Sequence, residues 1–156
     1  MVQVEFLQAI EQLAPIRALR ISFYAYPLVN AAHVLAIGAL VTSVTLMDLR
    51  ILGFLTAQER RPFLKLMRRV GIAAFCGAAA TGLLLFSVRA SEYFFNPAFR
   101  LKMVLIALAG LNLLALRLFA SGPGGMPRER SAVIFAGLSM VLWLGVLVCG
   151  RFIGFL

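Results

Sequence analysis

The side chain best suited to chemistry in this sequence is His33, the only histidine among the 156 residues. It lies within the apolar run "YPLVNAAHVLAIGALV". An ionisable group inside such a run is a functional hypothesis by default, because an apolar environment penalises charge. Imidazole is the commonest metal ligand and a physiological proton carrier. His33 is therefore a candidate ligand for haem or a metal, or a group for proton or quinone chemistry. The alternative is a neutral histidine that hydrogen-bonds a neighbouring helix.

A single histidine limits which cofactor the chain can hold. One imidazole cannot supply both axial ligands of a bis-histidine haem, so haem b would need His33 alone, a methionine partner or a second copy of the chain. Copper would need additional soft ligands. The candidates for that role are Met103, Met140, Cys76 and Cys149. Haem b and copper are thus both open as cofactors.

A second cluster of charged and aromatic residues surrounds the predicted connection between the second and third apolar runs. Its members are Arg89, Glu92, Tyr93, Arg100 and Lys102. Cations near a helix N-terminus suit anionic groups. We predict that Arg89, Arg100 and Lys102 join His33 in binding a cofactor, for example through haem propionates, or that they hold an anionic lipid or a partner. The alternative is ordinary contact with lipid headgroups.

Further polar residues are predicted to hold the helices together. Asn30, His33 and Asp48 recur at helical spacing and should share a stripe that faces other helices. A buried carboxylate at Asp48 needs a cationic partner, for which Arg50, Arg69 and Arg117 are candidates. Asn112 is expected to hydrogen-bond across a helix interface. The predicted structural polar residues are Asn30, Asp48, Arg50, Asn112 and Arg117.

Motifs for catalysis are missing from the sequence. There is no nucleophile–base pair, phosphate-binding glycine loop, paired carboxylate or HExxH motif. The stretch 122–125, "GPGG", is a turn because no strand precedes it and no Lys-Ser/Thr ending follows. We predict no catalytic residue, and we do not expect the chain to be an enzyme on its own.

Composition requires a membrane. The chain is 62% hydrophobic and only 13% charged, whereas soluble domains are nearer half apolar and a quarter charged. The net charge of +9 does not indicate nucleic acid, because the basic residues lie between apolar runs, where they set membrane orientation. The predicted partners are the lipid bilayer and either further copies of the chain or a larger membrane complex.

Hydrophobic periodicity predicts one all-α membrane domain over residues 1–156. It is an up-down-up-down four-helix bundle preceded by an amphipathic helix in the membrane interface. The interfacial helix covers residues 2–14 and ends before Pro15; the spans cover about 24–47, 70–88, 98–120 and 131–150. Asn96-Pro97 has the pattern of an N-cap and first helical residue. Residues 89–95 should be a loop, and Pro62 should start a short interfacial helix within the basic connector.

A face of small residues runs along the second predicted span. Gly71, Ala74, Ala78 and Gly82 recur at intervals of three or four. Small residues let helix backbones approach closely in lipid. The face therefore predicts either tight internal packing or self-association into an oligomer.

The distribution of basic residues predicts the orientation. The connectors after the first and third spans carry more lysine and arginine than the opposite side. The positive-inside rule places these connectors in the cytoplasm. We therefore expect a multi-pass protein of the bacterial inner membrane with both termini on the periplasmic side.

Three segments, "YPLVNAAHVLAIGALVTSVTLMDLRILG", "ATGLLLFSVRA" and "NPAFRLKMVLIALAGLNLLAL", resemble a family of uncharacterised bacterial four-helix inner-membrane proteins. The matching positions are His33, Asp48, Arg50, Thr81, Gly82, Asn96, Pro97, Phe99, Lys102 and Asn112. The resemblance extends more distantly to the membrane domain of copper-resistance D proteins and to small b-type cytochromes, which place histidines in short helical bundles. It implies a four-helix membrane fold. Such cytochromes usually have paired histidines, whereas this chain has one.

Together these patterns favour a small inner-membrane subunit that binds haem or a metal at His33 for redox or metal handling. One alternative is a cofactor-free structural or assembly subunit of a membrane complex. Another is a transporter for small solutes or ions, which would need oligomerisation because four helices in one chain are too few to enclose a pathway.

Overall fold

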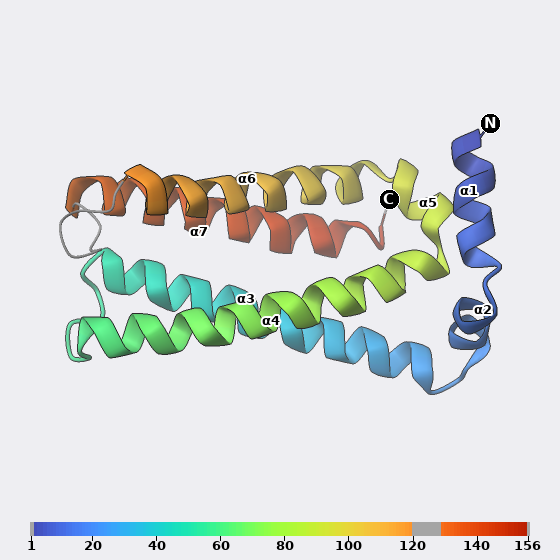
Figure 1. Ribbon diagram of the computed structural model, residues 1–156, viewed down its shortest axis with the longest axis horizontal. Helices are drawn as coiled ribbons and strands as arrows, with labels where there is room; N and C mark the ends of the chain where they lie inside the picture. The colour runs from blue at the N-terminus through green and yellow to red at the C-terminus, as the bar shows by residue number, and fades with distance from the viewer. Residues whose placement is uncertain (1, 120–128, 156) are drawn as a thin grey trace.

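The computed structural model describes residues 2–119 and 129–155, which form seven helices. Four of them are long and apolar: α3 Ala25–Ile51, α4 Arg60–Val88, α6 Pro97–Phe119 and α7 Glu129–Phe152. Each contains a candidate membrane span of at least 20 residues, which is about the length that crosses a bilayer. Successive long helices run antiparallel (Figure 1). The predicted all-α, four-span membrane fold is confirmed.

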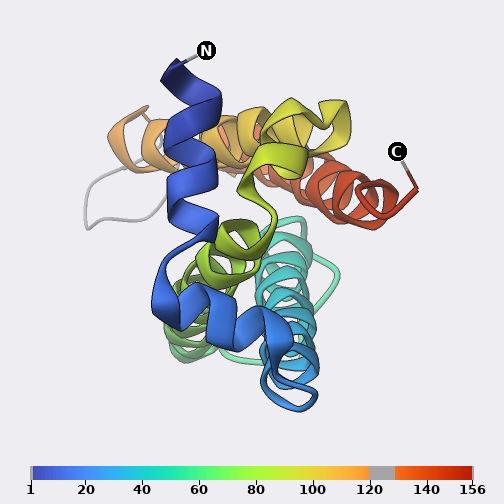
Figure 2. The same cartoon turned by 90° about the vertical axis from the view of Figure 1, so that its right-hand side faces the viewer.

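The four spans form two hairpins joined by one contact between them. α3 packs on α4, α6 packs on α7, and α3 also packs on α7, whereas α4 and α6 make no close backbone contact over their described residues. Figure 2 shows the two hairpins as separate layers. Even in the best-buried span only 22% of the apolar window lies inside the protein. The remaining apolar surface suits lipid, because hydrocarbon is as apolar as these side chains.

The small-residue face of α4 is used for packing against α3. An added Cβ at Gly71 would lie 3.1 Å from Ser43 Oγ, and one at Gly77 would lie 3.6 Å from the Ala36 Cβ. Ser43 is itself buried, and its hydroxyl donates to the Leu40 carbonyl over 2.9 Å. Of the two uses predicted for this face, internal packing is therefore the one observed.

The N-terminal segment differs from the prediction. The helix expected over 2–14 ends earlier, as α1 Val2–Glu11, and a second helix, α2 Ala14–Ile21, follows at once. Pro15 lies in the first turn of α2 instead of only ending α1. Proline favours a first helical turn because its φ angle is already helical and its missing N–H has no partner to lose there.

Two connecting segments also differ. α4 is continuous from Arg60, with Pro62 in its first turn, so no separate interfacial helix forms. Residues expected to be a loop form the short helix α5 Ala90–Phe95. In both places, residues whose polarity suggested a connecting loop are helical. Charged side chains at a helix end can reach the membrane surface, so their polarity does not prevent a helix there.

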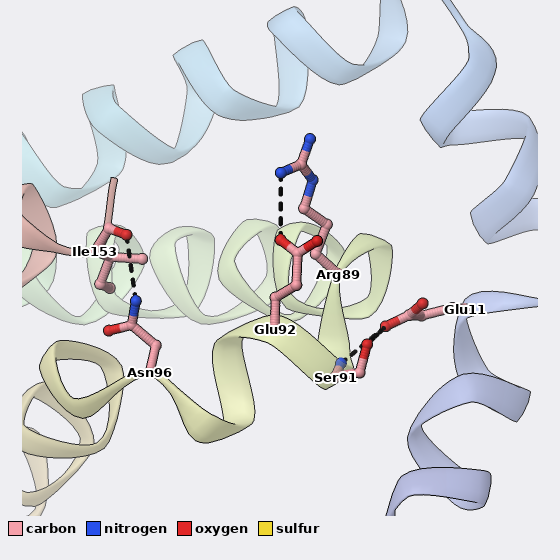
Figure 3. A network of polar contacts seen from close by, with 6 residues as sticks. All are labelled: Glu11, Arg89, Ser91, Glu92, Asn96 and Ile153. Carbon is pink, nitrogen blue, oxygen red and sulfur yellow. Dashed lines mark hydrogen bonds and ion pairs between the residues drawn. The ribbon is translucent and has the colours of Figure 1, made fainter. Parts of the chain in front are cut away.

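Asn96 begins α6 as predicted. Its Oδ1 accepts hydrogen bonds from the backbone N–H groups of Ala98 (2.9 Å) and Phe99 (3.1 Å). Its Nδ2 donates to the Ile153 carbonyl over 3.4 Å, just beyond α7 (Figure 3). Asn96 therefore caps one helix of the second hairpin and ties down the end of the other.

Enlarging Gly71 should destabilise the α3–α4 hairpin. Gly71→Leu places a side chain against Ser43, and overpacking of this kind costs about 1–3 kcal/mol of the free energy of unfolding. Gly38→Leu is the matched control, because an added Cβ at Gly38 meets nothing within 4 Å. Unfolding in detergent micelles measures both. Equal stability of the two variants would contradict close packing at Gly71.

Candidate functional site

His33 lies against α4. Its Nδ1 is 2.9 Å from Thr81 Oγ1, and an added Cβ at Gly82 would be 3.0 Å from its Cε1. The histidine ring thus occupies the space that a glycine leaves on the small-residue face. The ring thus joins α3 to α4 at a level about eight residues from the start of α3.

The Thr81 hydrogen bonds favour one form of the imidazole. The Thr81 hydroxyl has one proton, and its oxygen lies 2.6 Å from the Gly77 carbonyl and 2.9 Å from His33 Nδ1. When that proton is donated to the Gly77 carbonyl, the hydroxyl oxygen accepts from His33, and a neutral His33 carries its proton on Nδ1. Nε2 then has a free lone pair, which is the form that can ligate a metal or accept a proton.

Lys102 is the second polar group at this level. It is half-buried on α6, and its Nζ would lie 3.6 Å from a Cβ added at Gly150 on α7. It is close enough to His33 for their charges to interact, and Cys149 is also within its electrostatic reach. His33 on the first hairpin and Lys102 on the second therefore face a common region.

The other predicted cofactor-binding cations lie elsewhere. Arg89 is exposed and forms an ion pair with Glu92, with 3.3 Å between Nη1 and Oε2. Arg100 is exposed on α6. Of the four residues predicted to bind a cofactor, His33 and Lys102 are within electrostatic range of each other, whereas Arg89 and Arg100 lie at the surface.

A polar cavity of about 430 Å³ lies at the end of the bundle that carries α1 and α2. Its lining residues are Glu11, Arg20, Tyr26, Val88, Arg89 and Glu92. The nearby Tyr93 is half-buried, and this burial, reinforced by Tyr26, raises the pKa of its phenol. Two of the lining residues, Glu11 and Arg20, precede the first span, so the predicted charged cluster is only part of this surface.

Glu11 fastens α1 to α5. Its Oε1 accepts hydrogen bonds from the Ser91 backbone N–H (2.8 Å) and from the Ser91 hydroxyl (2.7 Å), as Figure 3 shows. These two bonds, aided by Arg20, lower the pKa of the Glu11 carboxyl below its ordinary value. The carboxylate also lies at the N-terminal turn of α5, where the backbone N–H groups favour negative charge.

The predicted polar stripe on α3 is wrong at Asn30. Asp48 is buried and His33 half-buried, but Asn30 is exposed. Toward its first residues α3 diverges from α7 (Figure 1). The two remaining residues also have different neighbours, because His33 contacts α4 and Asp48 lies beside Ser139 of α7.

The predicted ion pair of Asp48 is not found among the described residues. Arg50 points away and donates through Nη2 to the Gln58 carbonyl over 3.0 Å, because residues two apart lie on opposite sides of a helix. Arg69 is exposed, and the side chain of Arg117 lies outside the described part of the chain. Asn112 donates from Nδ2 to the Phe135 carbonyl over 3.0 Å, which is the type of interhelical bond expected of it.

Two of the candidate copper ligands lie at the surface. Cys76 and Met103 are exposed, on α4 and α6. Within residues 2–119 and 129–155, no group of three or more His, Cys, Asp or Glu side chains is placed to hold a metal ion. His33 therefore belongs to no such group among the described residues.

Sequence patterns alone missed the partners of the polar residues. Thr81 lies inside a run of small residues. The signal for its role was that Gly82, which belongs to the small-residue face, directly follows it. Glu11 and Ser91 are 80 positions apart, so no local pattern links them. Comparisons with protein-family models, with curated proteins and with solved structures find no match, and the resemblance to a bacterial membrane family stays a prediction.

The contact between α1 and α5 should weaken in acid. An undocked Glu11 has an ordinary carboxyl pKa of about 4.3, and the docked value is lower. Its stabilising effect is complete above the ordinary pKa and is lost as the pH falls through the docked value. Hydrogen exchange of α1, corrected for intrinsic rates, should show increasing opening below about pH 4.

Two variants test this assignment. Glu11→Gln should raise α1 opening roughly fivefold at neutral pH, equivalent to about 1 kcal/mol for an exposed charge-assisted bond, and abolish the acid dependence. Glu5→Gln on the same helix should behave like the wild type. An acid transition that persists in Glu11→Gln would contradict the role of Glu11.

Proposed function

We propose that this protein is a small membrane subunit that binds haem b through Nε2 of His33. The observation that carries the proposal is the hydrogen-bond chain from His33 Nδ1 through Thr81 Oγ1 to the Gly77 carbonyl. Metal-bound histidines almost always donate their other ring N–H in this way, which fixes the tautomer and the ring orientation. A bound haem would supply one-electron chemistry.

Haem fits His33 better than copper. A porphyrin brings four nitrogen ligands of its own, so one protein ligand is enough to hold its iron, as in globins. A protein copper site needs several soft or imidazole ligands, and the described residues do not assemble such a group. The remaining axial position would be open, or filled by a methionine or by a second copy of the chain.

Lys102 is the proposed partner of a haem propionate. Ammonium–carboxylate hydrogen bonds are among the stronger polar contacts in proteins, and a half-buried lysine benefits from an anionic partner. Because Lys102 belongs to the second hairpin and His33 to the first, a ligand held by both would bridge the hairpins. Arg89 and Arg100, being at the surface, are assigned to lipid headgroups.

The proposed location is the bacterial inner membrane, with both termini periplasmic. The N- and C-terminal ends lie at the same end of the bundle (Figure 1), as an even number of spans requires. The opposite end carries Arg60, Arg61, Lys65, Arg68 and Arg69 on the first turns of α4. The positive-inside rule favours the cytoplasm for that end.

A second candidate function is a cofactor-free structural or assembly subunit. The observation that favours it is the tight contact of the His33 ring with Gly82, which would join α3 to α4 even without a ligand. In that case the Thr81 bond would serve only to satisfy a buried polar group.

The absorbance spectrum of the purified protein, expressed with ample haem precursor, separates the two candidates. Haem binding predicts a Soret band that is lost in His33→Ala and weakened in Thr81→Val. Removing a residue that hydrogen-bonds a metal-ligating histidine typically lowers the affinity for the metal 10- to 100-fold. Thr81→Ser keeps the hydroxyl and should keep the band. Lys102→Met should weaken haem binding, and Arg100→Gln on the same helix should not.

A colourless wild type that cannot be reconstituted with haem would overturn the ligand role. If His33→Ala then lowered the free energy of unfolding, the structural function would be supported instead. Unchanged stability in that variant would count against both functions.

A further inference from the structure

Two buried oxygen atoms in the other half of the bundle have no hydrogen-bond partner. They are Asp48 Oδ2 on α3 and Asn112 Oδ1 on α6. Only 6% of the Asp48 surface and 8% of the Asn112 surface is exposed. Both atoms are acceptors, and leaving a buried acceptor unsatisfied costs about 1–3 kcal/mol, with more for a charged group.

Both side chains converge on one face of α7. The Asn112 amide donates to the Phe135 carbonyl over 3.0 Å, which fixes its orientation and turns Oδ1 the other way. The Asp48 carboxyl lies within interaction range of the Ser139 side chain. Phe135 and Ser139 are four residues apart, so they lie on one face of the helix about 6 Å from each other along its axis. Asp48 and Asn112 therefore approach the same short stretch of α7 from two different helices.

These groups have the chemistry of a cation site. A carboxylate, an amide carbonyl and a hydroxyl are the oxygen ligands that hard cations prefer. The structure offers no ion pair to Asp48 within the described residues, because the one salt bridge there joins Arg89 and Glu92. A buried carboxylate that stays ionised needs a compensating positive charge.

The charge of the site selects the class of ion. The three ligands carry one negative charge between them, so a monovalent cation leaves the site neutral. A divalent cation would leave a net charge in an apolar environment, which is costly. We propose that Asp48, Asn112 and Ser139 bind a small monovalent cation such as Na⁺ at the junction of α3, α6 and α7.

Cation binding here would strengthen the joint between the two hairpins. The contact of α3 with α7 is what links them, since α4 and α6 make no close backbone contact. An ion shared by α3, α6 and α7 adds bonds across that joint, and any ligand that binds only the folded protein stabilises it. The site is separate from His33, which lies near the opposite end of α3 and contacts α4.

The test compares Na⁺ with choline at constant ionic strength, using the protein purified in a neutral detergent. The midpoint of thermal unfolding should rise in a saturable way with Na⁺, by about 3 °C or more, and should not rise with choline. Asp48→Asn and Asn112→Leu should abolish the response, and Ser139→Ala should weaken it. Glu59→Gln, which removes an exposed carboxylate ahead of α4, should respond like the wild type.

Direct binding of radioactive sodium covers the case in which a variant fails to fold. Wild-type protein should bind about one Na⁺ per chain, displaced by unlabelled Na⁺ and not by choline. Absence of saturable binding by the wild type would overturn the proposal, as would equal effects of Na⁺ and choline on unfolding. A folded Asp48→Asn protein with the full Na⁺ response would overturn the assignment of Asp48.

Discussion

The rest of the structure depends on the close approach of α3 and α4 over a face of small residues. Lipid gives helices no hydrophobic reason to associate, so packing and polar bonds between them must supply the attraction. Gly71, Gly77 and Gly82 let α3 come near enough for His33 to reach Thr81. Gly82 leaves the space that the imidazole occupies. A Thr81 hydroxyl that donates to the Gly77 carbonyl favours the imidazole form with its proton on Nδ1.

α3 is the central helix of the fold because it contacts its own hairpin partner, α4, and also α7 of the other hairpin. One side packs on α4 and another on α7. Each contact includes polar residues. His33 meets Thr81 of α4 near the start of α3, and Asp48 lies beside Ser139 of α7 near its end. Toward the end of the bundle that carries α1, α3 diverges from α7 (Figure 1). A ligand bound at His33 and an ion bound at Asp48 would both affect how the two hairpins are positioned relative to each other.

Local signals predicted the parts of the fold that local physics determines. The four apolar runs exceed the bilayer thickness, and Asn96-Pro97 begins α6 because the capping bonds involve only its neighbours. The α1–α5 contact was not predictable in this way, since Glu11 meets Ser91 only after the chain has crossed the membrane twice. The stripe prediction failed at Asn30. Helical spacing gives the direction of a residue around its own helix, but it does not give the length over which a neighbouring helix stays in contact. Likewise Asp48 was matched to cations expected at the same end of the bundle, whereas the structure places it beside Ser139 of α7.

The most direct test of the central claim is nitrogen NMR of the purified protein labelled with ¹⁵N-histidine in detergent or lipid. The chain has one histidine, so the spectrum contains one ring and needs no assignment by mutation. At a pH where the ring is neutral, protonated Nδ1 and unprotonated Nε2 are predicted, with the Nδ1 proton protected from exchange by Thr81. A proton on Nε2, or a rapidly exchanging mixture of tautomers, would contradict both the hydrogen-bond chain and the ligand-competent state of His33.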